Sequence, residues 1–374
     1  MIYFDNAATT PMLPEAITAM HDVEPYFGNA STLYDIGQKS AELLQTCRTE
    51  IAEMIEAEPD QIYFTSGGSE GDNTVVRSFR SVLTSNIEHH AVLNNTTLDW
   101  PYSTLVDQNG TVDLDYLQKY CNKYSELTDL ISVMYVNNEI GIIQPLVAIS
   151  HMCHSKGLLF HTDAVQAVGH MPINVRKIDC DFLTASAHKF GGPKGVGFLY
   201  AKDATELTPL IRGGHQENGL RAGTENVVGV VGMTAALKQS LKYVVEDEFH
   251  CKLMSDYIIR EVEKIGCVIN AKNGKRMSHI ISIRLPGISG QSMASFLNDH
   301  EICVSTGSAC NSGNDAPSHV LKAIGLTDEE ARNTIRVSLS PQNTTEEATE
   351  FLKWLTYYVK ESGDECVPAA GGNN

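Results

Sequence analysis

The most informative chemistry in the sequence is a lysine at the end of an apolar segment. Ser186-Ala-His-Lys189 closes this segment and is followed by Phe-Gly-Gly-Pro-Lys-Gly. A buried ammonium group is costly unless its charge is used or removed, and partial burial favours the neutral amine that attacks an aldehyde. Ser186 and His188 lie beside the lysine and could donate hydrogen bonds to a phosphate. Taken alone, this short motif more commonly indicates a lysine that extends from the strand end into solvent.

An acidic residue, Asp163, ends another apolar segment 26 residues before the lysine. A buried carboxylate needs a cationic or hydrogen-bonding partner. The protonated pyridine nitrogen of pyridoxal 5'-phosphate (PLP) would be such a partner, and the pairing makes the ring an electron sink. Gln166 could then reach the ring hydroxyl. In isolation, Asp163 could instead be the N-cap of a helix.

Two further segments could complete a cofactor site. Thr65-Ser-Gly-Gly68-Ser69 is a glycine turn between a strand and a helix, where free backbone N–H groups bind phosphate. It matches neither the dinucleotide-binding nor the P-loop template, which weakens a nucleotide hypothesis. His89 could stack on a cofactor ring, although adjacent histidines at a loop edge are usually solvated. His151 and His154 could suggest a metal site, but histidines on an amphipathic helix are more commonly packed or on the surface.

The spacing of apolar residues predicts the elements that position these groups. Helices are predicted at 36–57 and 146–156, and strands at 61–65, 130–136, 158–162, 181–187 and 196–201. Strands that alternate with helices predict an α/β fold with a mainly parallel sheet, covered on both faces. Lys189 and Asp163 both follow strands of this sheet.

The pattern changes after a long helical stretch at 227–264. It then predicts strands at 278–285, 302–305 and 333–340 with helices at 289–299 and 344–361, the last opened by the capping box Thr344-x-x-Glu347. This is typical of a smaller α+β domain. Because 374 residues exceed one ordinary core, we expect a large domain over 16–260 and a small domain formed by 1–15 and 261–374.

Composition excludes several classes of function. The net charge of −18 argues against nucleic acid as a direct ligand, because phosphate backbones bind basic surfaces. No apolar run is long enough for a membrane span, and the N-terminus has no signal core. The nine scattered cysteines form neither a disulfide framework nor a metal motif, so most are expected to be buried in a reducing compartment. These features predict a cytoplasmic enzyme without a bound metal.

The combination of motifs resembles one family across nearly the whole chain: the cysteine desulfurases of the class V aminotransferase superfamily, the NifS/IscS type. The matching motifs, in order, are Tyr3-Phe-Asp-Asn-Ala-Ala-Thr-Thr-Pro11, Phe27-Gly-Asn-Ala-Ser31, Phe64-Thr-Ser-Gly-Gly-Ser-Glu70, Glu88-His-His-Ala-Val92, Val136-Asn-Asn138-Glu-Ile-Gly141, Asp163-x-x-Gln166, Ser186-x-His-Lys189, Gly219-Leu-Arg-Ala-Gly-Thr224-Glu-Asn226, Gly307-Ser-Ala-Cys310 and Ile335-Arg336-Val-Ser338. The resemblance implies a PLP-dependent transferase of fold type I.

The resemblance also assigns roles to residues. It implies that Lys189 binds the cofactor covalently, that Asp163 pairs with its pyridine nitrogen and that His89 stacks on its ring and could share in proton transfer. Gln166 would contact the ring hydroxyl. The residues implied to hold the phosphate are Gly68, Ser69, Ser186 and His188, with Thr224 reaching across from the partner subunit of a homodimer. Asn138 and Arg336 resemble the residues that bind the carboxylate of L-cysteine, for which arginine offers a bidentate fork.

Cys310 occupies the position of the family's persulfide-forming cysteine. Its neighbours from 305 to 315 are small and polar, which is typical of an exposed loop, and the loop length resembles the group I desulfurases. The implied reaction removes sulfur from L-cysteine, leaves L-alanine and places the sulfur on Cys310 as a persulfide. An acceptor protein in iron–sulfur cluster assembly or a thiolation pathway would then receive it.

Some positions depart from the family pattern. His215 stands where a third glycine is usual, Ala30 replaces a proline and Tyr34 replaces a histidine. No catalytic group is lost, but these departures leave substrate preference and pathway open. The alternatives are a selenocysteine lyase, another class V enzyme such as an aminotransferase, or a non-catalytic scaffold with the same fold. The cysteine in Gly-Ser-Ala-Cys310 argues against an aminotransferase, and the presence of Lys189 and Asp163 argues against a scaffold.

Overall fold

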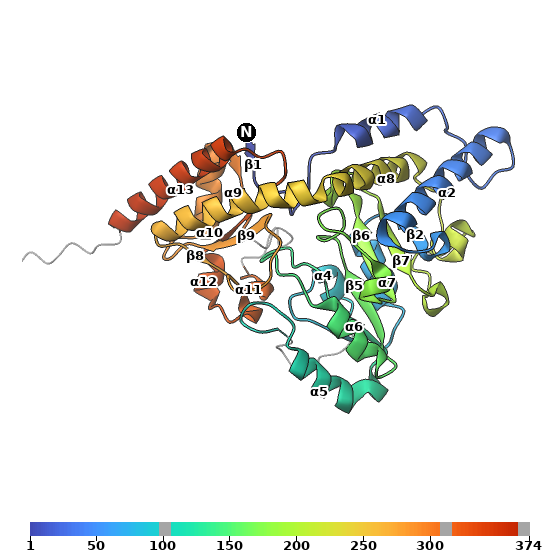
Figure 1. Ribbon diagram of the computed structural model, residues 1–374, viewed down its shortest axis with the longest axis horizontal. Coiled ribbons are helices and arrows are strands. Elements are labelled where there is room, and N and C mark those ends of the chain that lie inside the picture. Colours follow the sequence, from blue (N-terminus) through green and yellow to red (C-terminus); the bar gives the residue numbers. More distant parts are fainter. Residues whose placement is uncertain (97–105, 307–315, 366–374) are drawn as a thin grey trace, which may run out of the picture.

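The central element is a six-stranded sheet in the order β2-β7-β6-β5-β4-β3 (Figure 1). The computed structural model describes residues 1–96, 106–306 and 316–365. The strands of this sheet are β2 (Ile62–Thr65), β3 (Val82–Thr84), β4 (Leu130–Ser132), β5 (Leu159–Asp163), β6 (Phe182–Ser186) and β7 (Gly197–Ala201). Strands β3 to β6 run parallel, which confirms the predicted α/β class.

Strand β7 is the exception, because it runs antiparallel to both of its neighbours, β6 and β2. Only residues 187–196 separate β6 from β7, too few for the helical crossover that a parallel pair requires. The chain therefore turns back along the sheet directly after Lys189.

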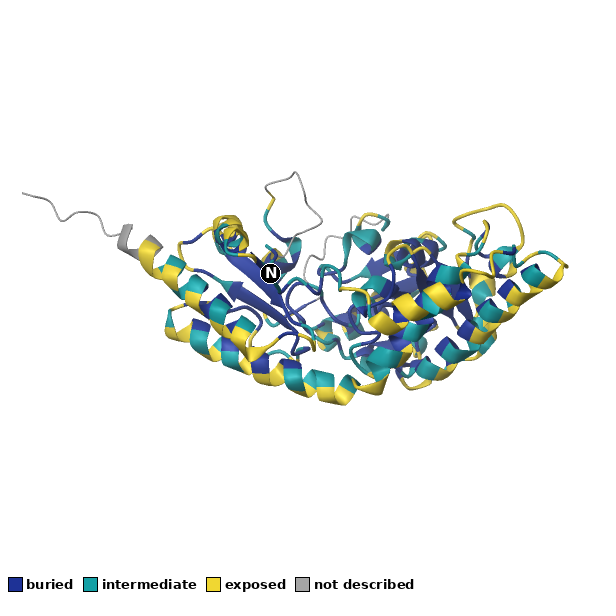
Figure 2. Ribbon diagram, turned by 90° about the horizontal axis from the view of Figure 1, so that it is seen from above, coloured by how far each residue is buried: buried dark blue, intermediate teal, exposed yellow. Residues whose placement is uncertain are grey.

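Helices cover both faces of the sheet, so its strands are buried on both sides. Every residue of β2, β6 and β7 is buried, and Figure 2 shows the strands as the buried centre of the molecule. The helices of this part are α1 (Pro14–Val23), α2 (Asp35–Ile55), α3 (Gly68–Val76), α4 (His90–Leu93), α5 (Leu114–Tyr124), α6 (Leu146–His154), α7 (Val175–Ile178) and α8 (Val227–Lys242). The short 3-10 helices are η1 (Pro59–Gln61), η2 (Ser125–Leu127), η3 (Ala187–Lys189), η4 (Ala204–Glu206) and η5 (Gln216–Gly219).

The C-terminal part has a second hydrophobic core of its own. Its elements are α9 (Val244–Lys264), β8 (Val268–Ile269), β9 (Ile280–Arg284), α10 (Gly290–Asp299), β10 (Ile302–Cys303), α11 (His319–Ala323), α12 (Asp328–Arg332), β11 (Thr334–Ser338) and α13 (Thr345–Glu365). Strands β11, β9 and β8 form an antiparallel sheet in that order. The strands of mixed direction and the helices packed on them agree with the α+β arrangement that the sequence predicted.

The N-terminal residues join this second core. Strand β1 (Ile2–Tyr3) pairs in parallel with β10, and the ring of Phe4 packs edge-on against Phe351, with 5.7 Å between the ring centroids. The expected helical stretch at 227–264 is divided into α8 and α9 at Tyr243, whose φ of −119° and ψ of 14° leave the helical region. The two helices follow one another end to end across both parts (Figure 1). The domain boundary expected at residue 260 falls within helix α9, and it remains a prediction.

Two local predictions can be compared directly with side-chain contacts. The capping box before α13 is confirmed, since the backbone N–H of Glu347 donates to Thr344 Oγ1 at 3.2 Å and that of Thr344 donates to Glu347 Oε2 at 3.0 Å. His154 contacts Asp179 and Asp181 at 3.1 and 2.9 Å, in agreement with the packed or surface interpretation.

Helices in the part of the chain that the structure describes are either too short or too polar to cross a membrane.

Candidate active site

Ten of the twelve predicted site residues line one cavity of about 350 Å³ between the six-stranded sheet and the C-terminal part. They are Gly68, Ser69, His89, Asn138, Asp163, Gln166, Ser186, His188, Lys189 and Arg336. Thr224 is not among the lining residues and is exposed on the loop after η5. Cys310 lies outside the described residues, so its predicted position is untested.

The cavity lies at the carboxyl ends of neighbouring strands. Asp163 is the last residue of β5, Ser186 is the last residue of β6, and η3 carries Lys189 directly after it. Because parallel strands bring their carboxyl ends to the same edge of a sheet, these groups converge although the sequence separates them.

Lys189 contributes its side-chain amine to this cavity. Its Nζ donates hydrogen bonds of 2.8 Å to the carbonyl oxygens of Ala7 and Ala8. Gln166 Nε2 donates to the same Ala7 carbonyl at 2.8 Å. The segment after β1 therefore forms one wall of the site and holds the amine at a fixed place.

Asp163 and His89 are both buried ionisable groups. Burial raises the pKa of Asp163 to about 6, although the backbone N–H of Val165 at 2.9 Å and nearby Lys189 favour the carboxylate. Burial, aided by Lys189 and His90, lowers the pKa of His89 to about 4. His89 Nδ1 accepts the backbone N–H of Ala91 at 3.1 Å, which leaves the proton of the neutral ring on Nε2.

The glycine turn at the start of α3 has the geometry of an anion site. Gly67, the N-cap, has a φ of +147°, which strongly favours glycine. A side chain at Gly68 would begin only 2.7 Å from Val165 Cγ2. Gly68 and Ser69 line the cavity beside Ser186 and His188. The first N–H groups of a helix have no partner within the helix, so this helix start can bind an anion.

Two ion pairs from the loop around η5 support this turn. Arg221 Nε binds Glu70 at 3.0 Å, and Glu70 in turn accepts the backbone N–H of Ser66 at 2.8 Å. Glu217 accepts the backbone N–H of Phe64 at 2.8 Å and pairs with Arg48 at 2.8 Å. His215 stands where the family pattern has a glycine, and the buried contacts of the nearby Glu217 are nevertheless formed.

A layer of buried polar groups lies beside Asp163, and no sequence motif predicted these groups. Asp72 lines the cavity and is almost fully buried; its Oδ1 lies 3.7 Å from His161 Nε2 and has no hydrogen-bond partner among the described residues. Burial and then the charge of Asp163 raise the pKa of Asp72 well above its usual value. Burial lowers the pKa of His161 to about 3, so its ring is neutral near pH 7. Burial and the neighbouring carboxylate both favour the protonated form of Asp72, whereas Asp163, with a pKa of about 6, carries a charge at that pH.

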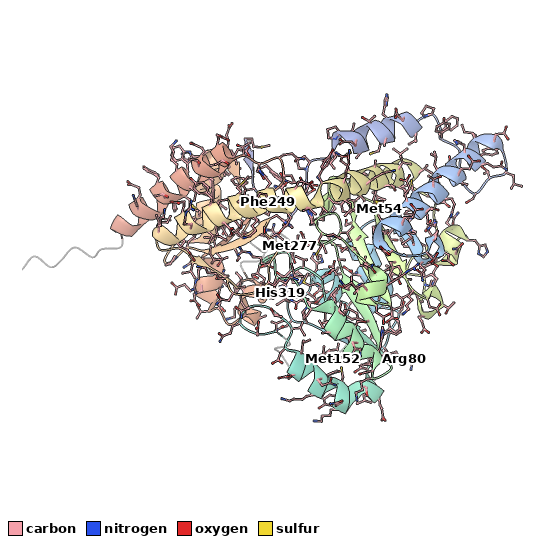
Figure 3. The ribbon with its side chains drawn as sticks, in the orientation of Figure 1. Met54, Arg80, Met152, Phe249, Met277 and His319 are labelled. Atoms are coloured by element: carbon pink, nitrogen blue, oxygen red, sulfur yellow. The ribbon has the colours of Figure 1, made fainter. Side chains whose placement is uncertain are left out.

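Other lining residues were missed for different reasons. Glu139 and His90 lie within the matching motifs, but the resemblance assigned no function to either residue. His319, labelled in Figure 3, stands in α11 and no motif pointed to it. Its Nε2 donates to the carbonyl of Glu88 at 2.9 Å, and its ring lies 4.7 Å from that of His90, between centroids. Groups of three or more potential metal ligands are absent from the described residues.

Glu88 provides a pH-dependent test of this buried layer. It is fully buried, and burial raises its pKa from 4.5 to about 8. The folded state holds a proton that the unfolded state has released, so stability is lost as pH rises from about 4.5 to about 8. Glu88→Gln, which cannot ionise, should raise the free energy of unfolding by roughly 2–4 kcal/mol more at pH 8 than at pH 5. Denaturant unfolding at both pH values measures this, with exposed Glu206→Gln as the control; an equal effect at both would contradict it.

Comparisons with known proteins identify the family of this chain. The family model described as Aminotransferase class-V matches residues 2–351. A curated relative from Dictyoglomus turgidum, named cysteine desulfurase IscS, is 40% identical over 96% of this chain and 95% of its own. A solved structure titled NifS-like protein is 31% identical with a TM-score of 0.88, covering 96% of this chain and 99% of the other. One titled SspA in complex with cysteine is also 31% identical, with a TM-score of 0.80, covering 92% and 100%.

The fold and the site together define a member of the class V aminotransferase family, whose enzymes depend on PLP. Within that family, the full-length relatives place the chain among the cysteine desulfurases of the IscS/NifS type.

Proposed function

We propose that this protein takes the sulfur atom of L-cysteine and leaves L-alanine, with PLP bound in the cavity around Lys189 and Cys310 receiving the sulfur. The observation that carries this is the cavity itself, which joins an amine, a buried carboxylate, an anion-binding turn and a guanidinium from four distant segments. The relatives named cysteine desulfurase support the reaction.

The residues present fit the cofactor. Lys189 would bind its aldehyde covalently, Asp163 its pyridine nitrogen and Gln166 its ring hydroxyl. The phosphate would take the start of α3, where the φ of Gly67 and the close approach of Val165 Cγ2 to Gly68 both favour glycine. When bound, PLP accepts the electrons that leave the substrate's α-carbon.

The chain's own residues would perform the remaining steps. Arg336 and Asn138 bind the carboxylate of cysteine, while Lys189 accepts the α-proton and neutral His89 keeps its stacking face uncharged. The Cys310 thiolate attacks the substrate sulfur, the carbon–sulfur bond breaks, and the sulfur stays on Cys310 as a persulfide. The carbon keeps the electron pair and takes a proton, which gives alanine. A thiolate suits this step because it is the strongest nucleophile among neutral-pH side chains.

The experiment that tests the proposal is product analysis of the PLP-loaded protein with L-cysteine. We expect one alanine for each sulfur released, with a transient added sulfur on the peptide that carries residue 310. Formation of pyruvate and ammonia instead would contradict the proposal. Parallel assays with selenocysteine and with keto acids distinguish the lyase and aminotransferase alternatives.

Replacement of Arg336 tests the carboxylate-binding role. Arg336→Ala should weaken the binding of cysteine at least roughly tenfold, because each charge-assisted hydrogen bond to a carboxylate contributes about 1.5–3 kcal/mol. The visible spectrum of bound PLP should stay unchanged. Titration of the PLP-loaded protein with cysteine measures both quantities, and a loss of PLP with unchanged cysteine affinity would show that Arg336 belongs to the cofactor site.

We further propose that the active form is a homodimer in which Thr224 completes the phosphate site of the other subunit. Thr224 is exposed, and Arg221 ties its loop to the glycine turn of its own subunit. Thr224→Ala should therefore weaken PLP affinity, while exposed Thr205→Ala serves as a control. Sedimentation should detect a dimer. A fully active monomer would be incompatible with this proposal.

The acceptor of the sulfur belongs to the same proposal. A protein carrying sulfur into iron–sulfur clusters or thiolated products would accept it from Cys310. The net charge of −18 favours a partner with a basic contact surface. Capture of the persulfide form with candidate acceptors, compared with the unmodified form, would identify it.

A further inference from the structure

Arg336, the proposed carboxylate-binding residue, already has a counterion. Its Nη2 donates to Asp5 Oδ1 at 2.6 Å, and its Nη1 donates to the backbone carbonyl of Asn138 at 2.8 Å. The Arg336 side chain is only 3% exposed and that of Asp5 is 20% exposed. A substrate carboxylate therefore meets a neutral pair at this position instead of an isolated cation.

The position of Asp5 is fixed by the backbone around it. Asp5 follows β1 and forms a parallel bridge with Ser338 at the end of β11, the strand that carries Arg336. The N–H of Ser338 donates to the carbonyl of Phe4 at 2.7 Å. Asp5 itself does not line the cavity, whereas Arg336 does. Any influence of Asp5 on a ligand must therefore act through the guanidinium.

We infer that Asp5 is a positioning residue with two effects on Arg336. Its hydrogen bond holds Nη2 in place, and its negative charge weakens the attraction of the site for an α-carboxylate. The inference rests on the proposed role of Arg336. Since cysteine and alanine carry the same carboxylate, this weakening speeds the release of the product as well as limiting the affinity for the substrate.

Asp5→Asn separates the two effects, because asparagine has nearly the same shape and can still accept a hydrogen bond from Nη2 but has no charge. We expect the PLP-loaded variant to bind L-alanine roughly five- to tenfold more tightly than the wild type, the size of one partly screened charge. The cofactor's visible spectrum reports this binding. In turnover, the KM for cysteine should fall and inhibition by alanine should increase.

Three comparisons show whether the effect belongs to the carboxylate. Binding of L-alaninamide, which lacks the carboxylate charge, should not tighten in Asp5→Asn. Asp5→Ala removes the acceptor as well, so it should bind alanine more weakly than Asp5→Asn. Asp22→Asn removes an exposed charge from α1 and should leave alanine affinity at the wild-type value. Unchanged PLP affinity and melting temperature in each variant exclude a folding defect as the cause.

Each other outcome overturns a stated part of the inference. Unchanged or weaker alanine binding by Asp5→Asn would exclude the electrostatic effect. Equal affinity of Asp5→Ala and Asp5→Asn would exclude the positioning effect. If Arg336→Ala leaves alanine affinity unchanged, the failure lies in the proposed role of Arg336, and the inference about Asp5 fails with it.

Discussion

A Lys189→Ala variant is expected to lose its covalent link to PLP and to lose turnover by on the order of 10³-fold or more. Lys189 places its amine in the cavity, where two backbone carbonyls hold it at 2.8 Å. It is the only lysine among the described residues that line this cavity. The same amine is proposed to bind the cofactor and to accept the α-proton, so its removal affects both functions.

Borohydride reduction followed by peptide mass analysis measures the covalent link. The wild type should carry the reduced cofactor on the peptide containing residue 189, and the variant should carry none. Lys194→Ala, an exposed position five residues further along, is the matched control and should retain both link and turnover. A reducible adduct elsewhere in Lys189→Ala would contradict the assignment.

Cys310→Ser is expected to keep the fold, the cofactor and the binding of cysteine while losing sulfur removal by on the order of 10³-fold or more. Cys310 is assigned from the sequence alone, and the other cysteines are poor alternatives to it. Six of the seven described cysteines are buried, and burial raises the pKa of the Cys251 and Cys267 thiols to about 12 and about 11. Such thiols are poor nucleophiles.

Alanine formation and the mass of persulfide-bearing peptides measure the effect. Cys303→Ser is the matched control, because Cys303 lies on β10, nearest in sequence among the described cysteines and only partly buried. That variant should desulfurate cysteine at a near-normal rate. The same rate in Cys310→Ser would favour direct elimination, as in a lyase.

Residues at the ends of apolar strands could be predicted well. Asp163 and Lys189 are polar groups directly after buried runs, and this contrast is local in the sequence. The parallel order of β4 to β6 follows from alternating strands and helices, whereas strand β3 was not predicted. The reversal of β7 was not predicted, although the short connection between the strands expected at 181–187 and 196–201 already favours an antiparallel pair.

Contacts between distant segments could not be predicted. The pairing of Asp5 with Arg336 joins residues 331 positions apart, and no pattern within either segment indicates the other. Asp72 was missed because a polar residue in the first turns of a helix usually faces solvent, whereas here the sheet buries it. His319 reaches the cavity only because α11 packs beside the segment around Glu88.

The contacts of Glu217 have a consequence for solubility. Strand β2 is at the edge of the six-stranded sheet, and a free edge is a template on which another chain can add as a further strand and start aggregation. Here Glu217 accepts the outward N–H of Phe64, and Arg48 donates to the carbonyl of Ile62. Two side chains thus occupy the places that an incoming strand would need. Since these two backbone groups are already bonded within the chain, addition of another strand along β2 is disfavoured.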